Sequence, residues 1–482
     1  MRGGGGKVAA RAKSPSPPPA PTTIPTTSWA PADRSVPEII GSLQEDYYNL
    51  CMEKSRKINS FVWHLLQEVD EEIEKGLEGI TLNIPGNSRL MPVERITGED
   101  LWILSRILKK NPYINGLDVR YNLMSDVGAY YAARLLQKQH KLIYLNLMFN
   151  DIGPEGGELI AKALHKNTTL KYLRMTGNKI ENKGGMFFAA MLQINSSLEK
   201  LDLGDCDLGM QSVIAFATVL TQNQTIKGIN LNRPILYGEQ EESTVHLGHM
   251  LKENHCLVAL HMCKHNMKNC GIKQLCDALY LNRSLRYLDV SCNKITRDGM
   301  VCLADVLKSN TTLEVIDLSF NRIEDVGAKY LSETLASHNR SLKALSVVNN
   351  NIKGEGLVAL SQSMKTNHIL SNVYIWGNKF DEATCVVCFV LFSFFFTEGF
   401  FWGLLYNIRH LQVALEMIVT YWGTWVAQWV KRLTLDFSSG HDLSLLSWSP
   451  VSGSALPEWS LLGILSLPLS FPCSLAWSLS QK

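Results

Sequence analysis

The chain has 482 residues, of which 46% are hydrophobic and 19% are charged, so it holds ample apolar material for a large core and is not a disordered protein. Its 47 basic and 45 acidic residues leave a net charge of +2, and we therefore expect no direct nucleic-acid binding. The 11 cysteines show no paired spacing and do not indicate a disulfide scaffold.

Residues 1–36 form a low-complexity arm rich in glycine and proline. The arm opens with Gly3 to Gly6 and continues through the proline-rich run from Ser14 to Pro19. Few of its residues could join a core, so we predict a flexible or polyproline-like tail. No apolar stretch follows the basic start, so we expect no secretory signal and reduced cysteines.

Residues 37–112 are predicted to be a mostly helical capping region. Apolar residues recur at helical spacing between residues 39 and 69, and a further helix is predicted over residues 98–110. That helix should end before Pro112, because a proline disfavours helical backbone in the residue before it. Between the helices, Ile80 and Leu82 indicate one irregular strand. This region is expected to shield the first repeat of the segment that follows.

Residues 113–385 repeat the unit L-x-x-L-x-L-x-x-N about ten times, with starts mostly 28 residues apart. In the copy from Leu142 to Asn150, the alternating leucines predict a short strand with one buried face, and the asparagine can bond the turn after it. Glycine follows six residues later in most copies, for tight packing or unusual backbone angles, and an apolar helix comes next. No unit can bury its own face, so the units must stack as a solenoid.

This period resembles that of the ribonuclease-inhibitor-like leucine-rich repeat family. The resemblance implies an α/β solenoid curved into a horseshoe, with parallel strands on the concave face and helices on the convex face. Three runs are similar to one group of proteins within this family: residues 118–122, 145–153 and 288–295. That closer resemblance implies a non-enzymatic protein of nucleus, nucleolus and cytoplasm in stem cells and germ cells. It also implies nucleophosmin and nucleolin as partners.

Strand side chains that lie between the buried leucines should face the inside of the horseshoe. Tyrosine, tryptophan and arginine dominate interface energetics, and aspartates on adjacent strands would favour a basic partner. We therefore predict a mixed-charge, aromatic protein-binding surface, while the alternative is that these residues only keep the face soluble. The candidates are Asp118, Arg120, Tyr144, Asn146, Tyr172, Arg174, Lys200, Asp202, His261, Tyr287, Asp289, Asp317, Tyr374 and Trp376.

No catalytic arrangement, cofactor site or metal site is predicted. The residues Cys256, His261, Cys263, His265 and Cys270 crowd together, but they lack paired C-x-x-C units and alternate strand residues face opposite ways. Asparagines in glycosylation-type sequences recur at one position just before the strand, and we interpret them as turn residues. They are Asn167, Asn195, Asn223, Asn282 and Asn310.

Residues 386–482 depart from the repeat pattern. The run from Phe389 to Phe396 is almost entirely apolar, and charges become sparse. One interpretation is a membrane tether through residues 385–408, which Glu398 interrupts. The favoured interpretation is alternative-isoform read-through, because residues 423–442 resemble a translated interspersed repeat element. The last repeat would then lack its proper polar cap, and we expect an aggregation-prone C-terminus.

The leading functional hypothesis is a protein-interaction scaffold. A regulator of an enzyme is the second, because the same repeat class includes ribonuclease inhibitors and activators of the Ran GTPase. Against it, the repeats lack the heavy cysteine content of ribonuclease inhibitors and show no motif matched to GTPase activation. A membrane-tethered repeat protein is the third, and it rests on the Phe-rich tail alone.

Overall fold

The computed structural model describes residues 42–89, 92–138, 141–237, 241–379, 381 and 384. The arm over 1–36 and the tail over 386–482, with both of its interpretations, lie outside the described residues. So do residues 239 and 240 of the acidic run 239–242, which was expected to form a protruding loop. No helix within the described ranges combines the length and the apolar character that a membrane crossing requires.

The first elements match the expected helices and strand. They are α1 (Leu43–Glu53), α2 (Ser60–Glu74), β1 (Ile80–Asn83) and α3 (Gly98–Lys110). At the start of α3 the Asp100 carboxylate accepts the Thr97 N–H at 2.8 Å, and the helix ends before Pro112 as predicted. Strand β1 pairs in parallel with β2, so this region extends the sheet of the repeats by one strand.

Ten repeats follow, and each begins with a short strand. In the first nine, the strand is followed by a helix within the described residues. The strands are β2 (Ile114–Asp118), β3 (Tyr144–Asn146), β4 (Tyr172–Arg174), β5 (Lys200–Asp202), β6 (Gly228–Asn230), β7 (Ala259–His261), β8 (Tyr287–Asp289), β9 (Val315–Asp317), β10 (Ala344–Ser346) and β11 (Asn372–Tyr374). The helices are α4 (Asp126–Lys138), α5 (Pro154–Leu164), α6 (Glu181–Leu192), α7 (Met210–Leu220), α8 (Glu242–Glu253), α9 (Asn269–Leu279), α10 (Arg297–Ser309), α11 (Glu324–Ser337) and α12 (Gly354–Ser363).

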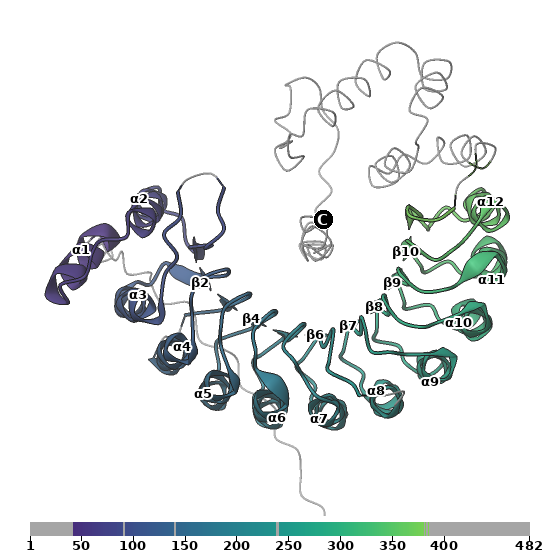
Figure 1. Cartoon of the computed structure of the whole chain (residues 1–482), viewed down its shortest axis with the longest axis horizontal. Helices are drawn as coiled ribbons and strands as arrows, with labels where there is room; N and C mark the ends of the chain where they lie inside the picture. Colours follow the sequence, from purple (N-terminus) through teal and green to yellow (C-terminus); the bar gives the residue numbers. More distant parts are fainter. Residues whose placement is uncertain are drawn as a thin grey trace, which may run out of the picture. The chain divides into compact units, whose positions relative to one another are not determined.

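Together with β1, these ten strands form one parallel sheet of 11 strands in sequence order. Within the described part of the chain, the strands lie along the inner side of the curved stack and the helices along its outer side (Figure 1). The predicted fold class is therefore confirmed. The repeat that starts at Ile226 is longer than the others, because the next one starts only at Leu257. The sheet is nevertheless undisturbed, since Gly228 of β6 pairs with Ala259 of β7.

The core is a stack of aligned apolar side chains. The central residues of neighbouring strands are register partners, as Leu260, Leu288 and Ile316 are, and all three are fully buried. Each therefore packs against the equivalent residue of the repeat before and after it. This is the shared interior that a single repeat could not form alone.

The predicted asparagine forms a ladder of buried amides at the end of the strands. Asn150 Nδ2 donates to Val119 O at 3.1 Å and to Leu147 O at 3.0 Å, while Oδ1 accepts the Met124 N–H at 3.1 Å. Each amide thus closes its own turn and completes the turn of the preceding repeat, which confirms its predicted role. Equivalent bonds to the preceding repeat are made by Asn122, Asn178, Asn293, Asn321, Asn350 and Asn378.

A second asparagine ladder runs just before the strands. Asn167 Nδ2 donates to Leu136 O at 2.7 Å, and its Oδ1 accepts the Leu170 N–H at 2.8 Å. These asparagines are turn residues, as predicted, and their burial leaves no room for a glycan in the folded chain. The ladder continues through Asn195, Asn223, Asn254, Asn282, Asn310, Asn339 and Asn367.

The recurrent glycine serves close packing. Gly156 lies in the regular helix α5, and a Cβ there would come within 2.5 Å of the Asp126 carboxylate oxygen and 2.7 Å of the Ile152 side chain. The same Asp126 oxygen accepts the Gly156 N–H at 3.1 Å. Of the two reasons expected for this glycine, tight packing is therefore the one that holds here.

In two repeats, another residue takes the position of the first-ladder asparagine and contacts the preceding repeat in its place. Cys206 Sγ contacts Met175 O at 3.2 Å, and His265 Nε2 lies 2.9 Å from Leu231 O. His265 is 1% exposed, and within the described residues its Nδ1 has no hydrogen-bond partner. Burial lowers the pKa of His265 from 6.5 to about 4.

We expect His265 to make stability fall in acid. Its folded pKa lies below the unfolded value, so the neutral ring stabilises the fold above pH 6.5 and that contribution is lost as pH falls towards about 4. The loss should reach about 3 kcal/mol at the acid end. Urea unfolding of the chain and of a His265→Asn variant should diverge between roughly pH 7 and pH 4.5. If the free energy of unfolding changed with pH equally in the two proteins, His265 would not be buried in its neutral form.

Candidate protein-binding site

The predicted binding residues lie on the strands or in the turns directly after them. All but Arg120 and Trp376 fall within β2 to β5, β7 to β9 and β11, while these two follow β2 and β11 by two residues. Asp118, Asn146 and Asp289 are buried, and the other candidates are half-buried. The concave row is therefore less open to a partner than the sequence suggested, and Asp118 and Asn146 contribute mainly to the fold.

The acidic and amide side chains of this row also have a structural task. Asp289 Oδ1 accepts the Ser291 N–H and Asp317 Oδ1 accepts the Ser319 N–H, both at 2.9 Å. The same bond to the residue two positions on recurs at Asp118, Asn146, Asp202 and Asn230. One carboxylate oxygen of each aspartate thus holds the turn, and the other is left for a further contact.

Five residues form what we call the N-terminal concave cluster: Asp118, Arg120, Asn146, Arg174 and Asp202. Asn146 Nδ2 donates to Asp118 Oδ2 at 2.9 Å, and Arg120 Nη1 lies 3.6 Å from the same oxygen. Arg174 Nε lies 3.3 Å from Asp202 Oδ2. Burial raises the pKa of Asp118, although Arg120 opposes that rise. The charges of this cluster are largely neutralised by one another.

Two tyrosines and a lysine lie beside that cluster. Lys200 Nζ sits 5.2 Å from the centre of the Tyr172 ring, a cation–π contact between β5 and β4. Burial lowers the pKa of Lys200 and raises the pKa of Tyr144. Among the described residues, no carboxylate lies within hydrogen-bond distance of Lys200. The neighbouring Glu199 pairs with Lys171 and Lys227 instead.

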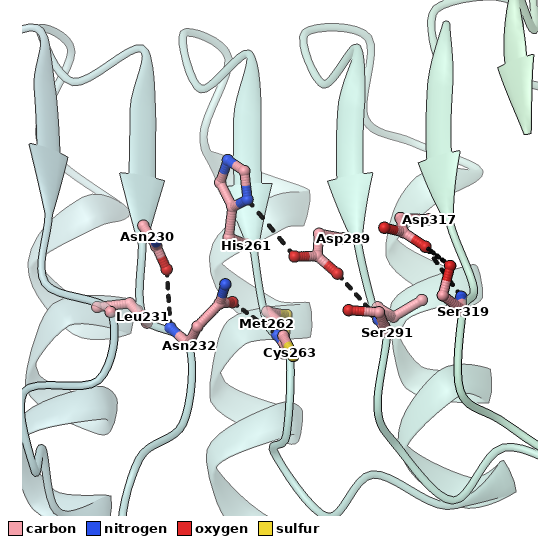
Figure 2. Close-up of polar contacts among 12 residues, drawn as sticks. Asn230, Leu231, Asn232, His261, Met262, Cys263, Asp289, Ser291, Asp317 and Ser319 are labelled. Carbon is pink, nitrogen blue, oxygen red and sulfur yellow. Dashed lines mark hydrogen bonds and ion pairs between the residues drawn. The ribbon is translucent and has the colours of Figure 1, made fainter. Parts of the chain in front are cut away.

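The C-terminal concave cluster consists of His261, Tyr287, Asp289 and Asp317. His261 Nδ1 lies 3.5 Å from Asp289 Oδ2, and the rings of His261 and Tyr287 are 4.7 Å apart between centroids. Figure 2 shows His261, Asp289 and Asp317 on three adjacent strands. This cluster carries two carboxylates, and within the described ranges neither pairs with a lysine or an arginine.

The two carboxylates influence each other. Burial and the negative charge of Asp289 raise the pKa of Asp317. Burial alone would raise the pKa of Asp289 as well, but the hydrogen bond and charge of His261, with the Ser291 bonds, outweigh it and hold that pKa below its ordinary value. Asp317 is therefore the less well compensated of the two, and a cation placed over it would gain the most.

Several contributing residues were not among the sequence candidates. Ser319 Oγ lies 2.5 Å from Asp317 Oδ1 and 2.6 Å from Ser346 Oγ, so a chain of hydroxyls supports that carboxylate. Further along the same line of turns, Asn232 Oδ1 accepts the Cys263 N–H at 2.7 Å (Figure 2). The signal that could have found them is their position, since each lies two residues after the last residue of a strand. Ser319 follows Asp317, Asn232 follows Asn230 and Cys263 follows His261.

The cysteine and histidine residues that crowd the sequence near residue 260 take different environments. His261 belongs to the C-terminal concave cluster, His265 is buried in the asparagine ladder, and Cys270 is exposed at the start of α9. Within the described residues, no group of three or more histidine, cysteine, aspartate or glutamate side chains could hold a metal ion.

Strands on one side, helices on the other and asparagine-closed turns define a leucine-rich repeat protein. The Leucine Rich repeat family model matches residues 138–161, 166–189, 195–217, 281–304, 309–332 and 338–361. Leucine-rich repeat-containing protein 34 of Homo sapiens is 81% identical over 354 residues, which span 73% of this chain and 76% of that protein. The Mus musculus protein of that name is 79% identical over 345 residues, 71% and 83% of the two chains.

This chain belongs to the leucine-rich repeat-containing protein 34 family. Among solved structures, a chain from the yeast complex of Rad7 and Elc1 aligns with 71% of this chain and 90% of its own length, at 15% identity and a TM-score of 0.42.

Proposed function

We propose that this chain is a non-enzymatic protein-interaction scaffold whose C-terminal concave cluster binds a basic segment of a partner. The observation that carries the proposal is the pair Asp289 and Asp317, two carboxylates on adjacent strands without a lysine or arginine partner in the described part of the chain. Leucine-rich repeat proteins generally act by binding other proteins on such surfaces.

The ionised Asp317 carboxylate is costly for the fold, which favours a binding role. Burial and the negative charge of Asp289 raise the pKa of Asp317, so its charged form opposes folding as it stands. Each aspartate has committed one oxygen to its own turn, and an asparagine could make that bond without the charge. An arginine or lysine from a partner would remove the repulsion, with Tyr287 and His261 packed beside it.

The finer assignment comes from the resemblance of the repeat sequence. We propose that the protein acts in nucleus, nucleolus and cytoplasm, that nucleophosmin and nucleolin are among its partners, and that it serves stem-cell and germ-cell regulation. Imaging of the tagged full chain beside a nucleolar marker tests the location. Exclusion of the chain from the nucleus would overturn this part of the proposal.

The role of the C-terminal concave cluster is tested by removing the charges of Asp289 and Asp317 while keeping the hydrogen bonds that close their turns. A variant with Asp289→Asn and Asp317→Asn retains the oxygens that hold Ser291 and Ser319, so its turns should stay closed and its thermal stability should stay close to that of the parent chain. In proximity labelling from the full chain, it should label its main partners at least about tenfold less.

The matched control carries Asp277→Asn and Asp298→Asn. Both of these aspartates are exposed, on the outer helices α9 and α10, so the control makes the same change in net charge away from the concave face. It should label the same partners as the parent chain. Equal labelling by all three proteins would refute a docking role for the C-terminal concave cluster.

A further inference from the structure

The outer surface at the N-terminal end of the stack holds a groove that the concave face does not include. It lies between α1, α3 and α4, which are neighbours in Figure 1, and encloses about 550 Å³. Its apolar floor includes Leu50, Trp102 and Leu135, and four of its lining side chains are basic: Arg106, Lys109, Arg134 and Lys138. We infer that this groove is a second docking site, and that it binds an acidic peptide segment of a partner.

Spacing along the helices places the basic side chains in two pairs. Arg106 and Lys109 are three residues apart on α3, and Arg134 and Lys138 are four apart on α4, so each pair lies on one face of its helix. All four residues are exposed. Two carboxylates, Asp46 and Glu53, lie on the α1 wall, so the lining residues still carry two more positive than negative charges. Glu53 in turn lies 3.5 Å from Lys54.

The four cations differ from most other basic residues on the outer helices. Lys162, Lys183 and Lys329 each lie within 3.0 Å of a glutamate, at Glu158, Glu155 and Glu355. Among the described residues, none of the four groove cations forms an ion pair, and Arg134 instead donates to the Tyr130 hydroxyl at 2.9 Å. Their charge is therefore available to an acidic ligand at little cost in broken contacts.

Trp102 orders the middle of the groove. Lys54 Nζ and the Arg106 guanidinium each lie 5.1 Å from the centre of its ring, so the indole holds both cations in place. Preorganised cations lose less side-chain entropy when a carboxylate binds them. An apolar side chain of the ligand would pack beside Leu50 and Leu135 while its acidic neighbours meet the two basic pairs.

The chain's own N-terminal arm is a poor occupant. Residues 1–36 contain Arg2, Lys7, Arg11 and Lys13 near their start and would be repelled by the basic pairs. The volume of the groove suits a few side chains of a short peptide. An acidic segment of another protein fits both the charge and the size.

The test titrates the full-length chain against a fluorescent peptide of glutamates with one central leucine, followed by anisotropy. We expect measurable binding that weakens when salt rises from about 50 to about 200 mM. The double charge reversal Arg106→Glu with Lys109→Glu should weaken binding at least about tenfold, and Trp102→Ala should weaken it severalfold. The matched control, Lys273→Glu with Lys365→Glu, reverses two exposed lysines on and beside other outer helices and should bind as the parent chain does.

Three results would overturn the inference. One is equal affinity of the parent chain and the α3 reversal. Another is an equal loss in the control, which would indicate an effect of net charge alone. The third is a single-stranded oligonucleotide of the same charge that binds as tightly and loses affinity in the same variant, because the groove would then accept any polyanion. Should the α3 reversal fail to fold by circular dichroism, Arg134→Glu with Lys138→Glu makes the same test from α4.

Discussion

Replacing Leu288 by alanine is expected to lower the free energy of unfolding by about 2–5 kcal/mol. Leu288 is fully buried at the centre of β8, and its register partners Leu260 and Ile316 are buried on either side of it. The cavity would therefore open in the shared interior of three repeats, where the rigid ladders on both sides of the strands limit collapse. Urea unfolding followed by circular dichroism measures the loss.

Leu281 provides the matched control for that substitution. It lies seven residues earlier in the chain and is 63% exposed, so Leu281→Ala should change stability by no more than about 0.5 kcal/mol. Equal stability of the two variants would mean that the β8 leucine does not belong to a continuous core, and the solenoid interpretation would fail with it.

Replacing Asn150 by alanine should cost about 2–5 kcal/mol, although the side chain is polar and small. Its Nδ2 donates to Val119 O, Leu147 O and Met148 O, and its Oδ1 holds the Met124 N–H. Alanine leaves the buried Met124 N–H without its acceptor, at roughly 1–3 kcal/mol, and removes one bond from each of the three carbonyls. Those carbonyls keep the bonds that they accept from Asn122, Asn178 and the Tyr121 N–H. Thermal and urea unfolding measure the effect.

Two further variants separate the bonds from the volume. Asn150→Asp keeps the shape and the acceptor oxygen but replaces the donor by a carboxylate that faces carbonyl oxygens, so it should destabilise at least as much as alanine. Asn49→Ala removes an exposed amide from α1 and should leave stability nearly unchanged. An aspartate variant as stable as the parent chain would show that the amide donor contributes nothing.

Local pattern was enough to predict the repeat. The alternation around Leu145, the asparagine at 150 and the stop before Pro112 each depend on residues close in sequence. Every repeat carries the same short-range signals, so ten agreeing copies define strand, turn and helix. The fold class and the strand direction follow from these signals with little else.

Contacts between repeats were harder to predict. The concave row was expected to be open, yet Asp118, Asn146 and Asp289 are buried because the neighbouring strands and turns cover them. Asn254 belongs to the second ladder but lacks the Asn-x-Ser/Thr pattern that marked Asn167, so only the structure reveals it. The basic groove likewise brings together α1, α3 and α4, whose side chains are far apart in sequence.

The asparagine ladders also bear on synthesis of the chain. Val119 O accepts one bond from Asn122 of its own unit and a second from Asn150, which lies 31 residues later. Leu136 O accepts its bond from Asn167, also 31 residues later. During translation, these bonds between units cannot form until the following unit has left the ribosome exit tunnel. Nascent chains of this protein should therefore fold one repeat behind the segment that is emerging. A ribosome stalled within the repeats should expose one uncovered repeat, to which chaperones can bind.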